Sequence, residues 1–122
     1  MGLESILKKK NRKTLIIGVE PEESAVINGK KKGSHGIDGI GAGFIPKTLD
    51  LNVIDEVLMI PTDEAKKSCD ELLCKEAFFI GFSTGAAFEA VKRIITRSNI
   101  KNENIVFLSP DFGTKYLSKM DV

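Results

Sequence analysis

Short apolar runs recur along this chain, and stretches with helical spacing separate them. The runs Thr14–Val19 and Asp55–Ile60 are predicted to be buried strands. Phe78–Ile80 and Ile105–Leu108 have the same apolar character, and Pro110 ends the second of them because proline cannot continue a central strand. The hydrophobic pattern therefore predicts four strands.

Between these strands, apolar residues return every three or four positions, which indicates helices. Leu3–Lys10 is predicted to form a short helix. Thr62 is expected to cap a longer helix that carries Asp63 and Glu64 in its first turn. This alternation predicts an α/β fold, with a mostly parallel central sheet flanked by helices, in a single domain over residues 1–122. The inward face of the helix after the third strand is marked by Ala87, Val91, Ile94 and Ile95.

Residues 30–46 form a long polar loop that contains five glycines and ends at Pro46. Its glycine spacing superficially resembles a dinucleotide-binding fingerprint, but that motif must follow a strand and open a helix, and this loop does neither. We therefore expect no NAD site. The loop instead fits a backbone that passes close to a flat ligand and needs positive φ angles or small side chains.

The stretch Ile80–Ala87 leads from a predicted strand into a helix through Ser83 and Thr84. Unpaired backbone N–H groups and a partial positive charge collect at such a helix start, which suits an anion or a polar heteroatom. A simpler alternative is that Ser83 or Thr84 is only the N-cap of the helix.

Composition and charge narrow the class of protein. Hydrophobic residues make up 42% of the chain and charged residues 29%, which is typical of a globular domain and not of a disordered one. The net charge of +1 does not indicate a nucleic-acid-binding surface. The basic run Lys8–Lys13 fits the solvated end of the first helix. No apolar run approaches transmembrane length, and no signal peptide opens the chain, so we expect a cytoplasmic protein without a membrane segment.

Residues that often bind metals or act as nucleophiles are scarce. Cys69 and Cys74 lie five positions apart, which favours free thiols over a disulfide or a metal site. His35 is the single histidine, and its neighbours Ser34 and Asp38 are too close in sequence for a catalytic triad. We expect no metal site.

Six segments, taken in order, closely resemble the C-terminal part of cysteine synthase (O-acetylserine sulfhydrylase). The resemblance runs from about Leu3 to Ser118. This family belongs to the fold type II, or β-family, pyridoxal-phosphate enzymes, together with cystathionine β-synthase, and the resemblance implies part of the large C-terminal domain of such an enzyme. The segments are Ile16–Pro21, Glu23–Val26, Gly39–Pro46, Asp63–Ala65, Gly81–Ala87 and Tyr116–Ser118.

The resemblance implies roles for individual residues around the cofactor, pyridoxal 5′-phosphate. Ser83 matches the serine whose hydroxyl bonds the pyridine nitrogen, and Pro110 matches a proline packed near the pyridine edge. Gly39 and Gly41 match backbone-contact positions of the loop that helps cover the cofactor. The substrate pocket is implied to include Asp38, which stands where many members have glutamine, together with Ile40, Ala42 and Phe44.

Three parts of the family pattern are missing from this chain. They are the lysine that forms a Schiff base with the cofactor, the loop that holds the substrate carboxylate, and the glycine-rich loop that cradles the phosphate. We therefore expect an incomplete domain without catalytic residues of its own: a truncated product, one half of a split protein, or an excised fragment. The complete enzyme would use O-acetylserine and sulfide to make L-cysteine and acetate, and this chain alone would be inactive.

Other functions stay open. The chain could be a non-catalytic partner that forms a dimer with a full-length synthase or binds the C-terminal tail of serine acetyltransferase. Asp111 follows Pro110 as in cystathionine β-synthases, so a fragment of that enzyme type is a further alternative. The last alternative is an unrelated α/β module that binds an anion at the helix start at Ser83.

Overall fold

A small parallel sheet lies at the centre of the fold. The computed structural model of the protein describes residues 2–11 and 13–119. Strand β1 (Ile17–Pro21) pairs in parallel with β2 (Glu56–Ile60), residue for residue along their whole length. The predicted parallel α/β arrangement is confirmed, and two of the four expected strands are present near their predicted positions.

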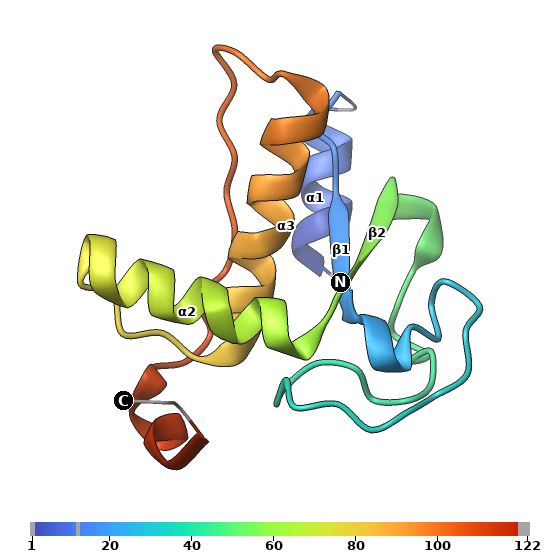
Figure 1. Ribbon diagram of the computed structural model, residues 1–122. Helices are drawn as coiled ribbons and strands as arrows, with labels where there is room; N and C mark the ends of the chain where they lie inside the picture. Colours follow the sequence, from blue (N-terminus) through green and yellow to red (C-terminus); the bar gives the residue numbers. More distant parts are fainter. Residues whose placement is uncertain (1, 12, 120–122) are drawn as a thin grey trace.

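Three α-helices surround this sheet: α1 (Gly2–Lys10), α2 (Thr62–Glu76) and α3 (Phe82–Ser98). In Figure 1, α3 stands beside β1 and α2 crosses the lower part of α3. The basic run ends α1 with three lysines in the last turn, as predicted, while Arg12 of that run lies outside the described residues. In the described ranges, no helix combines the length and apolar character needed to cross a membrane. Short 3₁₀ helices complete the chain: η1 (Glu22–Ser24), η2 (Leu51–Val53) and η3 (Gly113–Lys119).

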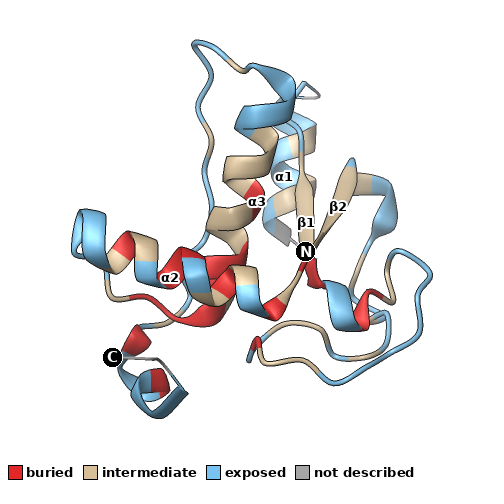
Figure 2. Cartoon of the chain, in the orientation of Figure 1, coloured by how far each residue is buried: buried red, intermediate tan, exposed pale blue. Residues whose placement is uncertain are grey.

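The core lies where α2 and α3 meet the end of the sheet, and Figure 2 shows the buried residues gathered there. The two helices are in close contact at Gly85. A Cβ atom at this position would lie 2.3 Å from the carbonyl oxygen of Ala65 and 2.5 Å from Cys69 Sγ. Glycine is therefore required for this helix contact, which fixes the direction of α3 and with it the position of the helix start.

The start of α2 is held by groups from other segments, and the prediction that Thr62 caps this helix is wrong. Pro61 occupies the N-cap position, and Thr62 is the first helical residue. The Thr62 hydroxyl accepts a hydrogen bond from the Gly36 N–H (3.1 Å), and the Thr62 N–H donates to Glu23 Oε1 (2.8 Å). Burial raises the pKa of Glu23, but this backbone bond, the other hydrogen bonds to the carboxylate and the nearby His35 together outweigh it and lower the pKa overall. The threonine thus ties the glycine loop to the helix.

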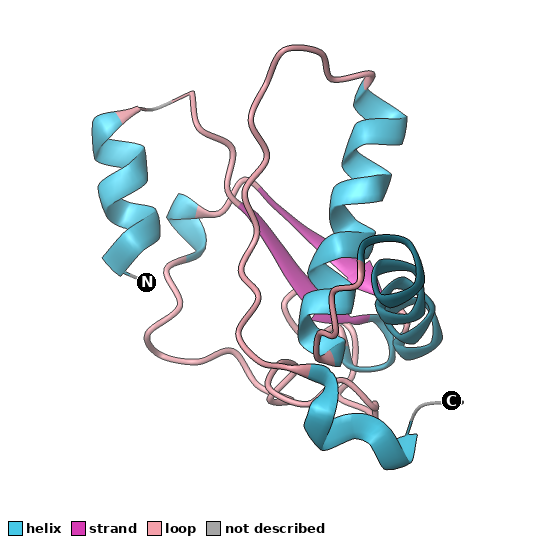
Figure 3. Ribbon diagram, turned by 90° about the vertical axis from the view of Figure 1, so that its left-hand side faces the viewer, coloured by secondary structure: helices cyan, strands magenta, loops and turns pink. Residues whose placement is uncertain are grey.

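Two of the expected strands do not form within the described residues. In the run Phe78–Ile80, only Ile80 is paired, through an isolated antiparallel bridge to Phe112. The run Ile105–Leu108 is extended but belongs to no sheet, and Figure 3 draws only β1 and β2 as strands. Apolar sequence favours a strand, but a strand also needs a neighbour whose backbone groups it can pair with, and these two runs have none beyond that single bridge.

Candidate functional site

A hollow of about 250 Å³ lies between the glycine loop, the start of α3 and the C-terminal segment. It brings together five residues that the sequence assigned to a cofactor and substrate site, although they come from three separate parts of the chain. Two further residues, Asp111 and Lys115, complete its lining. The five predicted residues are Asp38, Gly39, Ile40, Ser83 and Pro110.

The glycine loop is held in shape by His35. The Ile37 N–H donates to His35 Nδ1 (3.2 Å), so this nitrogen is the acceptor and Nε2 carries the proton that bonds the Gly41 carbonyl oxygen (2.9 Å). Ile37 is fully buried beneath the loop. The ring therefore acts as a structural clamp, and the loop is ordered despite its length and glycine content.

The prediction of positive φ angles in this loop is confirmed. Gly39, Gly41 and Gly43 have φ angles of 91°, 66° and 81°. At Gly41 a Cβ atom would also lie 2.6 Å from His35 Nε2 and from Pro21 Cγ, so space excludes a side chain there. At Gly39 nothing lies within 4 Å of such an atom, so this residue leaves its side of the hollow open.

The start of α3 places Ser83 against the hollow. Gly81 is the N-cap in extended conformation, and Ser83 and Thr84 lie inside the first turn, so the alternative that either is only an N-cap is wrong. Thr84 is buried, and its hydroxyl donates to Ser109 Oγ (3.2 Å). Ser83 is half-buried and lines the hollow. The Thr84 hydroxyl therefore serves packing, while Ser83 lies at the hollow beside Asp111.

Asp111 is the centre of a network that the sequence did not reveal. Its Oδ2 accepts a hydrogen bond from the Tyr116 hydroxyl (2.7 Å) and an ion pair from Lys115 Nζ (2.8 Å). Its backbone carbonyl accepts the N–H of Gly81 (3.2 Å), and a Cβ atom at Gly81 would lie 2.0 Å from Asp111 Oδ1. Burial raises the pKa of Asp111, but the bonds from Lys115 and Tyr116, with a contribution from Ser83, outweigh it and lower the pKa.

This network orders the C-terminal segment against the helix start. Tyr116 is buried, with its ring centroid 4.7 Å from that of Phe82 in α3. Lys119 at the end of η3 reaches back to Asp38, with Nζ 3.3 Å from Oδ2. The i, i+4 spacing of Asp111 and Lys115 was the available signal in the sequence, but nothing in it indicated that Asp111 would contact the start of α3.

The remaining predicted site residues lie away from this hollow. Gly41 packs against His35 and Pro21, and Ala42 is exposed at the outer side of the loop. Phe44 is 63% exposed. Their assignment to the cofactor loop and substrate pocket stays a prediction.

Lys115 is the one lysine among the described residues that line the hollow, and its chemistry does not suit a nucleophile. The ion pair with Asp111 raises its pKa, so its amine stays protonated at neutral pH. A lysine that attacks a carbonyl group needs the opposite, a lowered pKa produced by burial or by a neighbouring cation. The cysteines offer no alternative: burial raises the pKa of the Cys69 thiol to about 11, and both Cys69 and Cys74 are free.

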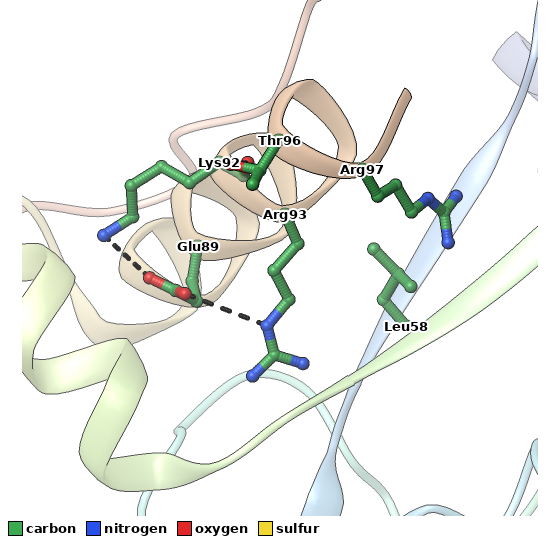
Figure 4. Close-up of a pocket in the computed structure, with 6 residues that line it drawn as sticks. All are labelled: Leu58, Glu89, Lys92, Arg93, Thr96 and Arg97. Carbon is green, nitrogen blue, oxygen red and sulfur yellow. Dashed lines mark hydrogen bonds and ion pairs between the residues drawn. The ribbon is translucent and has the colours of Figure 1, made fainter. Parts of the chain in front are cut away.

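A second hollow, of about 440 Å³, lies between β2 and α3 (Figure 4) and contains no predicted site residue. Its charged side chains are paired with one another or with neighbours. Lys92 Nζ lies 2.7 Å from Glu89 Oε2 and 2.8 Å from Glu71 Oε2. Arg93 bonds Glu64 and donates to the Met59 carbonyl oxygen (2.9 Å).

Burial raises the pKa of Glu89 in this second hollow, but hydrogen bonds from Lys92 and Ser68 outweigh it and lower the pKa. Arg97, the remaining charged residue, is paired with Glu56 of β2. The cations that line this hollow are thus all engaged by carboxylates. Its ion pairs join α2, α3 and β2, so we infer that they serve to hold these elements together.

Comparisons with known proteins identify the family of this chain. Residues 1–111 match the family described as "Pyridoxal-phosphate dependent enzyme". A cysteine synthase of Buchnera aphidicola from Schizaphis graminum is 43% identical over 96% of this chain, and cysteine synthase A of Escherichia coli K12 is 38% identical over the same share. The chain spans 39% of the length of each of these relatives.

Solved structures give the same result. A cysteine synthase from Entamoeba histolytica superposes with a TM-score of 0.92 at 41% identity, over 96% of this chain and 35% of that one. An O-acetylserine-dependent cystathionine β-synthase from Helicobacter pylori superposes with a TM-score of 0.80 at 34% identity, over 96% of this chain and 38% of that one. Because the family match covers most of the chain and these similarities cover nearly all of it, the protein belongs to the family of pyridoxal-phosphate dependent enzymes.

Proposed function

We propose that this chain is the C-terminal portion of a pyridoxal-phosphate-dependent cysteine synthase, which replaces the acetate of O-acetylserine with sulfide to give L-cysteine. One observation carries this proposal: the fold gathers Ser83, Pro110 and Gly39 around one hollow. These are residues that resemblance to the family assigns to the cofactor ring. The similarity to cysteine synthases over 96% of the chain supports the same reaction.

The residues present fit the ring end of the cofactor. Ser83 lies in the first turn of α3 and lines the hollow, where its hydroxyl would bond the pyridine nitrogen as a neutral partner. Oδ2 of Asp111 is engaged by Lys115 and Tyr116, and Oδ1 is buried against Gly81 without a hydrogen-bond partner in the described part of the chain. Asp111 therefore orders the site while Ser83 faces the ring.

When bound, pyridoxal phosphate supplies the electron sink that makes loss of the α-proton and of acetate feasible. A neutral serine at the ring nitrogen, unlike a carboxylate, does not hold that nitrogen protonated, which keeps the sink mild and favours β-replacement. Gly39 leaves room for the loop backbone to approach the ring. Asp38 places a carboxylate at the rim, where Lys119 partly balances its charge.

We propose that the chain is inactive alone. Proton transfer at the substrate requires an amine that is unprotonated at neutral pH, and the ion pair with Asp111 keeps the amine of Lys115 protonated. We therefore assign the cofactor-bonding lysine and the phosphate cradle to the part of the curated cysteine synthases that lies outside their alignment with this chain. The free thiols of Cys69 and Cys74 fit a cytoplasmic enzyme, and a homodimer is the proposed assembly.

A second candidate is a portion of a cystathionine β-synthase-like enzyme, with an amino-acid thiol in place of sulfide. Two observations favour it: the Pro110–Asp111 pair at the hollow, and the 34% identity with the Helicobacter pylori enzyme. A non-catalytic role is the third candidate, in which the chain pairs with a full-length synthase or binds the C-terminal tail of serine acetyltransferase.

The test supplies what this chain lacks. We define the complementing fragment as the part of the Buchnera (Schizaphis graminum) cysteine synthase outside its alignment with this chain. Cysteine formation from O-acetylserine and sulfide is measured for the chain, for the fragment and for both with pyridoxal phosphate. We expect turnover only from the mixture. Turnover by the chain alone, or greater turnover with homocysteine than with sulfide, would contradict the proposal.

A matched pair of serine variants sharpens this test. Ser83→Ala removes the hydroxyl at the hollow, whereas Ser98→Ala removes an exposed hydroxyl at the end of the same helix. In the mixture we expect Ser83→Ala to lower turnover at least tenfold and to shift the visible absorption of the bound cofactor. Ser98→Ala should change neither, and equal behaviour of the two variants would remove Ser83 from the site.

A further inference from the structure

His35 is a titratable side chain whose two ring nitrogens have opposite roles in the glycine loop. Nδ1 accepts the N–H of Ile37 (3.2 Å), and Nε2 donates to the carbonyl oxygen of Gly41 (2.9 Å). Only the neutral ring can do both, because a protonated imidazole carries a donor at each nitrogen and no acceptor. His35 is the single histidine of the chain, so the binding of one proton changes this clamp.

The hydrogen bond that protonation removes cannot be replaced where it lies. Ile37 is 0% exposed, so water does not reach its N–H group once Nδ1 stops accepting. Protonation would place two N–H groups face to face, and a buried donor without a partner is costly. His35 itself is only half-buried, so its ring can turn outward. The charged ring therefore requires the loop to move.

The charged groups around the loop favour one direction for that movement. Glu23 of η1 interacts electrostatically with the ring, and its Oε1 accepts the N–H of Thr62 at the start of α2. In the segments that contact the loop, the other charged side chains either have partners elsewhere (Glu20, Asp38, Glu64, Lys115 and Lys119) or lie at the surface (Glu22, Lys30, Lys31, Lys32 and Asp63). Glu23 is therefore the carboxylate toward which a charged ring is drawn.

We propose that His35 is a pH-sensitive clamp of the glycine loop. The uncharged ring holds Ile37 and Gly41 together; on acidification the charged ring leaves Ile37, turns toward Glu23 and lets the loop open. An imidazole group changes its charge between about pH 5 and 8, so the switch responds to small changes near neutral pH. Residues 38–40 line the smaller hollow, which loses its loop side when the clamp opens.

The first experiment uses the full chain without any ligand, so it does not depend on the proposed function. NMR of the ring nitrogens follows protonation from about pH 7.5 to about pH 5. We expect the proton on Nε2 at the upper end and protons on both nitrogens at the lower end. Hydrogen exchange at the Ile37 amide, corrected for the intrinsic effect of pH on exchange, should become at least tenfold faster. The amide of Ala86 in the core should keep its protection, which separates loop opening from unfolding.

Three variants test the two halves of the switch. His35→Gln supplies an amide that can donate to Gly41 and accept from Ile37 without titrating, so its exchange should show no acid response. Glu23→Gln keeps an acceptor for the α2 start but removes the charge that attracts the ring, so the midpoint should move to lower pH by at least about 0.3 pH units. Glu22→Gln, at the exposed neighbouring position, is its control and should move the midpoint less.

Three results would overturn the proposal: equal exchange at Ile37 at both ends of the pH range, the same acid response in His35→Gln as in the wild type, or a proton on Nδ1 at about pH 7.5. If His35→Gln does not fold, the wild-type signals decide. The ring nitrogens and the Ile37 amide must then change with one midpoint, and two different midpoints would contradict the clamp. Equal midpoints in Glu22→Gln and Glu23→Gln would overturn the role of Glu23.

Discussion

The two hollows of this protein differ in how their polar groups are used. In the larger one, between β2 and α3, Lys92, Arg93 and Arg97 are each bound by carboxylates of the same chain. In the smaller one, the carboxylates of Asp111 and Asp38 are paired with Lys115 and Lys119, while Ser83 and the glycine loop contribute neutral polar groups to the lining. The hollow between β2 and α3 has the greater volume, but the smaller hollow contains the residues that we predict to bind a ligand.

The difference shows how a binding surface can be distinguished from a structural network. Ion pairs that satisfy one another hold elements together and leave little for a ligand. A site keeps part of its polar surface uncommitted and fixes it by packing behind it, as the Asp111 network and the His35 clamp do here. Substitutions in the two hollows should therefore have effects of different size.

The largest effect is expected from Gly81→Ala. The new Cβ atom would lie 2.0 Å from the Asp111 carboxylate, so the network behind the smaller hollow must shift, and we expect a loss of about 2–3 kcal/mol in unfolding free energy. Gly39→Ala, which meets no atom within 4 Å, should lose only about 1 kcal/mol for its positive φ angle. Urea denaturation measures both, and equal losses would show that the contact with Asp111 does not matter.

A smaller effect is expected from Asp111→Asn. The variant keeps an acceptor for Tyr116 but loses the ion pair with Lys115, so we expect a loss of about 1–2 kcal/mol at pH 7. The folded pKa of Asp111 is lowered, so its contribution is present above the unfolded carboxyl pKa and is lost as pH falls toward the folded value. The gap between wild type and variant should therefore close on acidification; a constant gap from pH 7 to pH 3 would contradict this.

His35→Ala tests the clamp of the glycine loop. Loss of the hydrogen bonds to Gly41 and from Ile37 should cost about 1 kcal/mol and should speed hydrogen exchange at the Ile37 amide. Ser34→Ala, at the exposed neighbouring position, is the control and should leave exchange unchanged. Unchanged exchange in His35→Ala as well would mean that the loop is ordered without the ring.

The smallest effect is expected in the larger hollow. Lys92→Met removes a partner of both Glu71 and Glu89, yet this lysine is partly exposed and such pairs contribute little. We expect a loss below about 1 kcal/mol that shrinks further in high salt, measured against the exposed control Lys101→Met. A loss larger than that of Gly81→Ala would reverse the ranking of the two hollows.

The elements with strong local patterns could be predicted from the sequence. β1, β2, α2 and α3 all follow from hydrophobic spacing, and the positive φ angles at Gly39 and Gly41 follow from the glycine pattern. The strand prediction for Ile105–Leu108 is wrong because an apolar run does not specify its partner, and strand pairing is decided by what lies beside it.

The polar details at the helix starts could not be predicted in the same way. Thr62 is held by Glu23 from 39 residues away, and Asp111 contacts Gly81 from 30 residues away. Local sequence carries no signal for such contacts, because tertiary packing creates them. The position of Ser83 could be predicted because an apolar run, a glycine and the helix start lie together in one short motif.

The central claim is that this chain supplies the ring end of the cofactor site and that the lysine bonded to the cofactor comes from elsewhere. The most direct measurement mixes the chain and the complementing fragment with pyridoxal phosphate, reduces the sample with borohydride and determines the intact mass of each chain. We predict one added cofactor on the fragment and none on this chain. A stoichiometric adduct on a lysine of this chain, Lys115 above all, would contradict the account.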